Sequence, residues 1–170
     1  MRKSLIISLC LALIFGLSLN LSAQSNEKEL DQAELLKQFI GTWQAESGKD
    51  SVLVIEFTPQ FKGLYAVQEN KADGKTYATY KGVIGLSDSK EMTIGAFIDN
   101  DGTMIFDIGK FVTKNKYASE RYFGNVTHAA TSLEWELTTP ETFVARFKWR
   151  GKGMTWPCDW GWDITFRRID

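Results

Sequence analysis

The sequence predicts an all-β fold, a single antiparallel meander β-barrel of about eight to ten strands with a short N-terminal helix. From Gly41 onward, β-branched and aromatic residues alternate with polar ones in short segments. Clusters of Gly, Pro, Asn, Asp and Ser separate these segments at short, regular intervals, as turns do between neighbouring strands. No helical periodicity occurs between the segments, which disfavours a parallel sheet.

The predicted strands are bounded by recognisable turns. Asp73-Gly74 is a two-residue hairpin signal, because both central positions of a type I′ turn require positive φ. Within the segments, apolar residues occupy every second position; Phe143, Ala145 and Phe147 form one such set. Successive side chains of a strand point to opposite faces, so each set predicts one wall of a core. The expected strands are residues 41–46, 51–58, 63–70, 75–86, 91–98, 103–112, 116–123, 132–138, 142–150 and 160–169.

A short helix is expected before the first strand. Asn26, with a Glu three residues further on, is spaced as a capping box. Leu30, Ala33 and Ile40 recur near helical spacing, with charged residues between them. We predict a helix over residues 27–39 whose apolar stripe lies across the mouth of the barrel. The alternative is a partly ordered leader.

The first 23 residues are predicted to be a secretory signal peptide, which leaves residues 24–170 as one barrel domain. Arg2 and Lys3 form a positive n-region, residues 5–19 form an apolar h-region, and Ala23 suits cleavage. A membrane anchor is the competing interpretation, but the apolar run is shorter than the roughly 20 residues that a spanning helix needs. We therefore expect an exported protein, secreted or periplasmic, with no stable membrane span after cleavage.

Charge and cysteine content limit the classes of partner. The full chain has a formal net charge of −1 and no strongly basic patch, so nucleic acid is not an expected partner. After cleavage Cys158 is the remaining cysteine, and a lone thiol cannot form an internal disulfide. The sequence leaves the oligomeric state open.

Catalytic and metal sites are not predicted. His128 is the one histidine of the chain, and no Cys or His spacing typical of a zinc site occurs. A nucleophile–base pair of Cys158 and His128 would require adjacency that the sequence does not indicate. Glu134 and Glu136 alternate with an apolar set, so they are expected to face outward. We therefore expect no enzyme activity, no metal and no cofactor.

Tryptophans concentrate near the C-terminus. Four of them lie in one short stretch that also contains Pro157: Trp149, Trp156, Trp160 and Trp162. Each offers a large apolar face and one hydrogen-bond donor. One interpretation is that they fill the barrel interior. The other is that Trp156, on the connecting loop, gates the cavity or stacks on a ligand ring, and we take all four as candidate ligand-binding residues.

Gly41, Thr42 and Trp43 form a Gly-x-Trp motif on the first strand after the helix, and Arg168 lies near the end of the last strand. With a meander between them, this layout resembles the lipocalin and calycin superfamily, in particular the uncharacterised lipocalin-like domains of exported bacterial proteins. The resemblance implies that Trp43 packs at the closed end of the barrel beneath the guanidinium of Arg168. The chain lacks the disulfide usual in larger lipocalins, and its strand number is nearer that of fatty-acid-binding proteins and nitrobindins.

The resemblance and the aromatic content together predict non-covalent binding of a small apolar or aromatic molecule in the barrel cavity. Nitrobindin-like barrels hold haem through a histidine, but His128 falls in an expected loop, so haem is not expected. Two alternatives stay open. One is a cell-envelope interaction protein with a filled barrel, and the other is an enzyme that uses cavity carboxylates.

Overall fold

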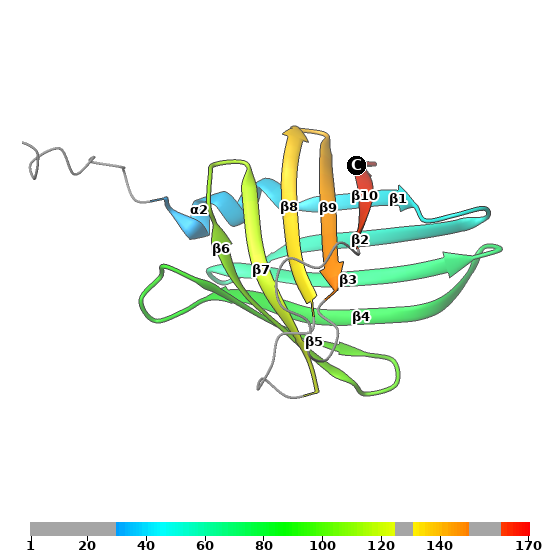
Figure 1. Ribbon diagram of the computed structural model, residues 1–170, viewed down its shortest axis with the longest axis horizontal. Helices are drawn as coiled ribbons and strands as arrows, with labels where there is room; N and C mark the ends of the chain where they lie inside the picture. Colours follow the sequence, from blue (N-terminus) through cyan, green and yellow to red (C-terminus); the bar gives the residue numbers. More distant parts are fainter. Residues whose placement is uncertain (1–29, 125–130, 150–160) are drawn as a thin grey trace, which may run out of the picture.

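The computed structural model describes residues 30–124, 131–149 and 161–170, which form a short helical segment followed by ten strands (Figure 1). The strand bounds lie close to those expected from the alternation of apolar and polar residues. In chain order the elements are α2 (Gln32–Leu36), the 3₁₀ turn η1 (Lys37–Phe39), β1 (Gly41–Glu46), β2 (Ser51–Gln60), β3 (Gly63–Ala72), β4 (Lys75–Leu86), β5 (Thr93–Asp99), β6 (Met104–Phe111), β7 (Lys116–Phe123), β8 (Thr131–Thr139), β9 (Thr142–Trp149) and β10 (Gly161–Arg168).

The ten strands form one closed antiparallel barrel. Each strand pairs with the next along the chain, and β1 closes the circle by pairing with both β2 and β10. At the closure Trp43 lies opposite Arg168, and Gln44 lies opposite Arg167. The closing pair is short, because β10 runs from Gly161 to Arg168 but is paired with β1 at these two positions. The predicted fold class, an all-β antiparallel meander barrel with a short helix before it, is confirmed.

The helical segment is shorter than the helix predicted over residues 27–39. The α-helix covers five residues, and a 3₁₀ turn continues it to Phe39. Asp31 caps it, because its Oδ1 accepts a hydrogen bond from the backbone N–H of Glu34 at 3.1 Å. A helix this short has little stability of its own, so packing must hold it in place. No helix in the described part of the chain is long and apolar enough to cross a membrane.

The helical segment is fixed over one end of the barrel, which we call the closed end. Gln32 is buried there and bonds both backbone groups of Phe111, the last residue of β6. The N–H of Phe111 donates to Gln32 Oε1 at 2.6 Å, and Gln32 Nε2 donates to the Phe111 carbonyl at 3.3 Å. One side chain thus completes the backbone hydrogen bonding where the strand ends.

Aromatic side chains fill the closed end. Phe39, from the 3₁₀ turn, is fully buried at the centre of the group. Edge-on and tilted ring contacts of this kind add to the free energy gained from apolar burial. The ring centroid of Phe39 lies 5.3 to 6.5 Å from those of five neighbours on five different strands, Trp43, Phe57, Phe111, Trp135 and Phe143.

Trp43 and Arg168 meet at the closed end beside Gly41. The guanidinium carbon of Arg168 lies 4.4 Å from the centroid of the Trp43 ring, within cation–π range. Arg168 Nη1 also donates to the Ile40 carbonyl at 2.6 Å, and Trp43 Nε1 donates to the Phe39 carbonyl at 2.7 Å. Gly41 has φ of +126°, and a Cβ there would lie 2.7 Å from Arg168 Nη1. A larger residue at position 41 would therefore displace the arginine.

Candidate ligand cavity

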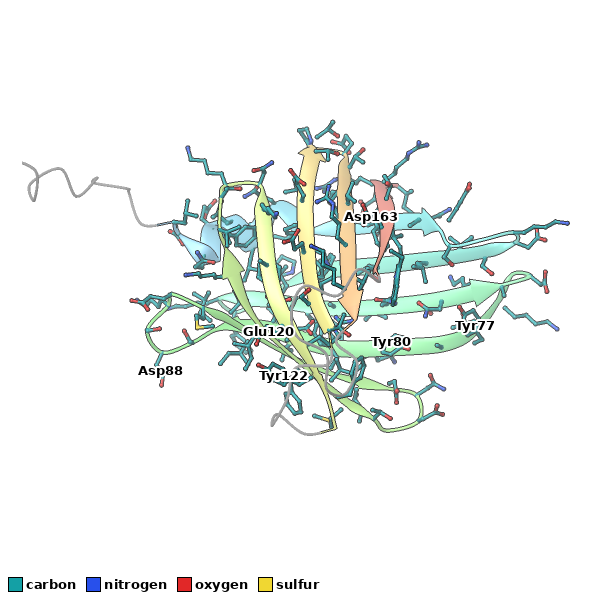
Figure 2. The ribbon with its side chains drawn as sticks, in the orientation of Figure 1. Tyr77, Tyr80, Asp88, Glu120, Tyr122 and Asp163 are labelled. Atoms are coloured by element: carbon teal, nitrogen blue, oxygen red, sulfur yellow. The ribbon has the colours of Figure 1, made fainter. Side chains whose placement is uncertain are left out.

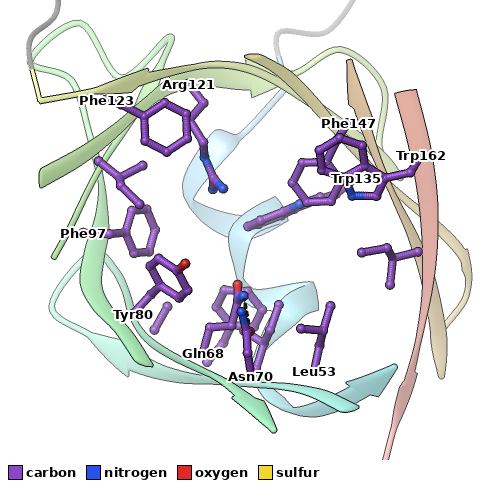
Figure 3. A pocket seen from close by; sticks show the side chains of 15 residues that line it. Leu53, Gln68, Asn70, Tyr80, Phe97, Arg121, Phe123, Trp135, Phe147 and Trp162 are labelled. Atoms are coloured by element: carbon purple, nitrogen blue, oxygen red, sulfur yellow. Dashed lines mark hydrogen bonds between the residues drawn. The ribbon is translucent and has the colours of Figure 1, made fainter. Parts of the chain in front are cut away.

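A cavity of about 260 Å³ occupies the half of the barrel away from the helical segment (Figure 3). This half leads to what we call the open end, where the hairpins β1–β2, β3–β4 and β5–β6 turn. Phe57 and Trp135, which belong to the aromatic group of the closed end, form part of its lining. The lining residues are Leu53, Ile55, Phe57, Ala66, Gln68, Asn70, Tyr80, Phe97, Ile105, Arg121, Phe123, Trp135, Phe147, Trp162 and Ile164.

Small residues in β4 and β5 set the shape of one cavity wall. Gly82 lies opposite Phe97 in the β4–β5 pairing. A Cβ at Gly82 would come within 2.5 Å of the Phe97 ring, and a Cβ at Gly95 would come within 2.8 Å of it. Contacts this short do not occur between real side chains, so both glycines are needed for the ring to lie where it does.

Arg121 and Asp107 form an ion pair across β6 and β7, where they are directly opposite in register. Arg121 Nε donates to Asp107 Oδ1 at 2.8 Å, and Nη2 donates to Oδ2 at 2.7 Å. This two-point geometry is the strongest that an arginine makes with a carboxylate. The Asp107 side chain is 5% exposed and that of Arg121 is 21% exposed, so the arginine covers the carboxylate on the cavity side.

The charge state of Arg121 follows from these contacts. Burial lowers the pKa of Arg121, but the charge of Asp107 and its hydrogen bonds together outweigh burial and raise the pKa above its ordinary value. The guanidinium is therefore charged at any physiological pH. Its third nitrogen, Nη1, makes no hydrogen bond within the described residues.

The other polar groups of the cavity are uncharged. Gln68 Nε2 donates to Asn70 Oδ1 at 2.8 Å, and both side chains come from β3. Tyr80 comes from the neighbouring strand β4. Figure 3 shows these three side chains entering the cavity on the side across from Arg121. A few convergent polar groups in an apolar chamber are typical of small-molecule sites.

Phe147 and Trp162 line the cavity and stack on each other. Their rings are stacked, with centroids 5.4 Å apart and an angle of 17° between planes. Trp162 is 51% exposed although it lines the cavity. Of the four tryptophans predicted to bind ligand, Trp162 is therefore the one that the described side chains place at the cavity. Trp149 ends β9 but its side chain is not described, and Trp156 and Trp160 lie outside the described residues.

The carboxylates considered for catalysis lie on the outer wall. Glu134 Oε2 lies 3.1 Å from Lys116 Nζ, and Glu136 Oε2 accepts a hydrogen bond from Arg146 Nη1 at 2.6 Å. Neither glutamate lines the cavity, as the strand alternation predicts. Arg146 also lies 3.5 Å from Asp163, a residue of β10 that Figure 2 labels.

Metal-ligating groups do not cluster in the described ranges, where no three His, Cys, Asp or Glu side chains could hold an ion together. The Asp99–Gly102 stretch is a turn: Asp99 Oδ1 accepts from the N–H groups of Asp101 at 2.9 Å and Thr103 at 2.8 Å. His128 and Cys158 lie outside the described residues, so the interpretations that involve them stay untested.

The Arg121–Asp107 pair was not predicted from the sequence, although a signal for it exists. Ile105, Asp107, Gly109 and Phe111 alternate along β6 and point inward. A single charge in such an apolar set indicates a buried partner, because unpaired charges are not buried. Arg121 is the corresponding charged residue on β7, where it lies between Ser119 and Phe123 in the inward-facing set.

Comparison with known proteins supports the fold. No protein-family model and no curated protein matches the chain. Among solved structures, the crystal structure of Rv2717c from M. tuberculosis is similar, with a TM-score of 0.61 at 14% sequence identity. The match covers 83% of this chain and 99% of that chain. At this identity the likeness concerns the fold alone.

Proposed function

We propose that this protein binds a small, mostly apolar or aromatic molecule in the barrel cavity. The observation that carries the proposal is the chamber of about 260 Å³, with aromatic walls and four polar side chains. Its volume lies just below the range of about 300–1,000 Å³ for sites that take drug-sized ligands. A compact molecule of one or two rings is the size of ligand that suits it.

The cavity supports ligand binding over the two alternatives raised by the sequence. A barrel that served only as a scaffold for its outer surface gains stability from a filled interior, since unfilled volume costs contacts. Catalysis by cavity carboxylates is disfavoured, because Glu134 and Glu136 are paired on the outer wall. We further propose that residues 1–23 direct export and that the mature protein acts outside the cytoplasm.

Native mass spectrometry of the protein purified from its own host tests the proposal directly. We expect a ligand-bound species that loses its extra mass on denaturation. Calorimetric titration of the ligand-free protein with 2-naphthol gives a second measurement, because this probe is neutral at pH 7 and has two fused rings.

A cavity-filling variant identifies where the probe binds. Ile164 lines the cavity on β10, whereas the neighbouring Thr165 is exposed. Ile164→Trp should abolish binding of 2-naphthol, and Thr165→Trp should leave it unchanged. If a folded Ile164→Trp variant bound the probe as tightly as the unaltered protein, the cavity would not be the site.

A further inference from the structure

Arg121 is the one charged residue among the described side chains that line the cavity. Its neutralising partner, Asp107, is absent from the lining and lies behind it at 5% side-chain exposure. The cavity is therefore lined by the Arg121 guanidinium, whose positive charge Asp107 already balances. The two hydrogen bonds to Asp107 use Nε and Nη2 of Arg121. The remaining nitrogen, Nη1, is therefore a hydrogen-bond donor whose positive charge is largely balanced by Asp107.

The balance of charge decides what can bind opposite Arg121. A ligand carboxylate placed at Nη1 would make a second anion beside one cation, close to the buried Asp107. One negative charge would then be left without compensation in a site of low polarity, which is strongly unfavourable. A neutral acceptor, such as a carbonyl oxygen, accepts the same hydrogen bond without adding charge.

The remaining polar groups are consistent with a neutral ligand. Gln68, Asn70 and Tyr80 offer uncharged donors and acceptors. The rings of Phe147 and Trp162, stacked 17° from parallel, add aromatic surface to the cavity lining. Together they suit a planar ring system that carries one or two neutral polar groups.

Building on the proposed cavity-binding function, we propose that the site selects uncharged aromatic ligands that carry a carbonyl-type acceptor, which binds Nη1 of Arg121. Asp107 acts as the selectivity residue, because it neutralises the arginine and so excludes carboxylates. Aromatic amides, esters, ketones and lactones belong to the accepted class. Aromatic and fatty acids in their ionised forms do not.

A matched pair of probes tests this selectivity. 2-Naphthamide and 2-naphthoate have nearly the same shape and differ in charge at pH 7, since carboxylic acids ionise well below that pH. Calorimetric titration of the full mature chain gives a Kd for each. The amide should bind at least about tenfold more tightly, because a like charge added beside a buried one costs more than that factor.

Asp107→Asn removes the balancing charge and should move the selectivity toward the acid. We expect the ratio of the naphthoate Kd to the naphthamide Kd to fall at least about tenfold in the variant. Glu136→Gln is the matched control: it removes one negative charge from an ion pair on the outer wall. That variant should leave the ratio unchanged. Thermal unfolding of each variant shows whether the barrel is intact.

The outcomes separate the two proposals. Binding of naphthoate as tight as that of naphthamide by the unaltered protein would overturn the selectivity and leave cavity binding standing. So would an unchanged ratio in a folded Asp107→Asn protein. If Asp107→Asn does not fold, the ratio in the unaltered protein alone decides. If neither probe nor 2-naphthol binds, cavity binding itself is wrong, and the selectivity falls with it.

Discussion

The closed and open halves of this barrel are built from the same strands but differ in what fills them. On β8 and β9, Trp135 and Phe143 are buried in a continuous aromatic group at the closed end. Further along β9, Phe147 is half-buried and faces the cavity instead. On β7 the change is chemical as well, from buried Tyr117 near the closed end to Arg121 at the cavity.

The helical segment accounts for much of this difference. Leu36 and Phe39 enter the closed end and occupy the space that the ten strands enclose. An eight- to ten-stranded barrel can be filled by its own side chains or can hold one ligand, and additional side chains at one end favour filling there. The aromatic core and the cavity are therefore separated along the barrel axis.

The largest expected effect comes from truncating the closed-end core. Trp43 is fully buried, so Trp43→Ala should cost about 3–5 kcal/mol of unfolding free energy, the range for deleting a buried aromatic side chain. Urea denaturation followed by circular dichroism measures the loss. A variant as stable as the unaltered protein would show that the closed end is not the stabilising half.

The next effect on stability is expected from deprotonation of Tyr117 in the closed half. Burial raises the pKa of Tyr117 to about 12, from an ordinary value near 10. The folded state therefore holds the phenol proton more tightly than the unfolded chain, and stability is lost as pH rises from about 10 to about 12. The full difference is about 3 kcal/mol.

Tyr117→Phe isolates this contribution from the other tyrosines. The Tyr117 hydroxyl lies 2.7 Å from Thr93 Oγ1, which itself can donate to the Gly109 carbonyl at 3.1 Å. Losing that hydrogen bond should cost about 1 kcal/mol at neutral pH. Urea midpoints from pH 8 to pH 12 should fall less steeply for the variant. Parallel curves for the two proteins would exclude the buried phenol as the cause.

Substitution of Arg168, at the closed end, is expected to have a smaller effect than the loss of Trp43. Arg168→Met removes the contact with Trp43 and the hydrogen bonds to the Gln38 and Ile40 carbonyls. We expect a loss of about 2 kcal/mol, typical of hydrogen bonds from a charged group. Arg167→Met, one residue away and exposed, is the control and should be nearly neutral in the same denaturation assay.

The smallest stability effect is expected at the open half. Trp162 is 51% exposed, so Trp162→Ala should lower the unfolding free energy by only about 1 kcal/mol. Loss of its ring should weaken binding of 2-naphthol by about 1 kcal/mol, several-fold in Kd. Thermal melts and calorimetric titrations measure the two changes. A loss of stability as large as that of Trp43→Ala would contradict the division between the halves.

The sequence could predict much of the fold but little of the site. Strand positions and facing were predictable because alternation and turn residues act over a few residues; the hairpin at Asp73-Gly74, where both residues have positive φ, is one case. The candidate site was sought among tryptophans, and only Trp162 is placed at the cavity by the described side chains. Arg121 was missed, because its role depends on a residue fourteen positions earlier.

Local preferences along the chain are enough to predict short antiparallel strands with one apolar face each. Which inward side chains meet depends on the pairing of strands that are distant in the chain. Closure of β1 onto β10 brings Gly41 to Arg168, and the β6–β7 register places Asp107 opposite Arg121. Whether the interior is filled depends on the volumes of all ten inward faces and of the helical segment together, and no single stretch of sequence contains that sum.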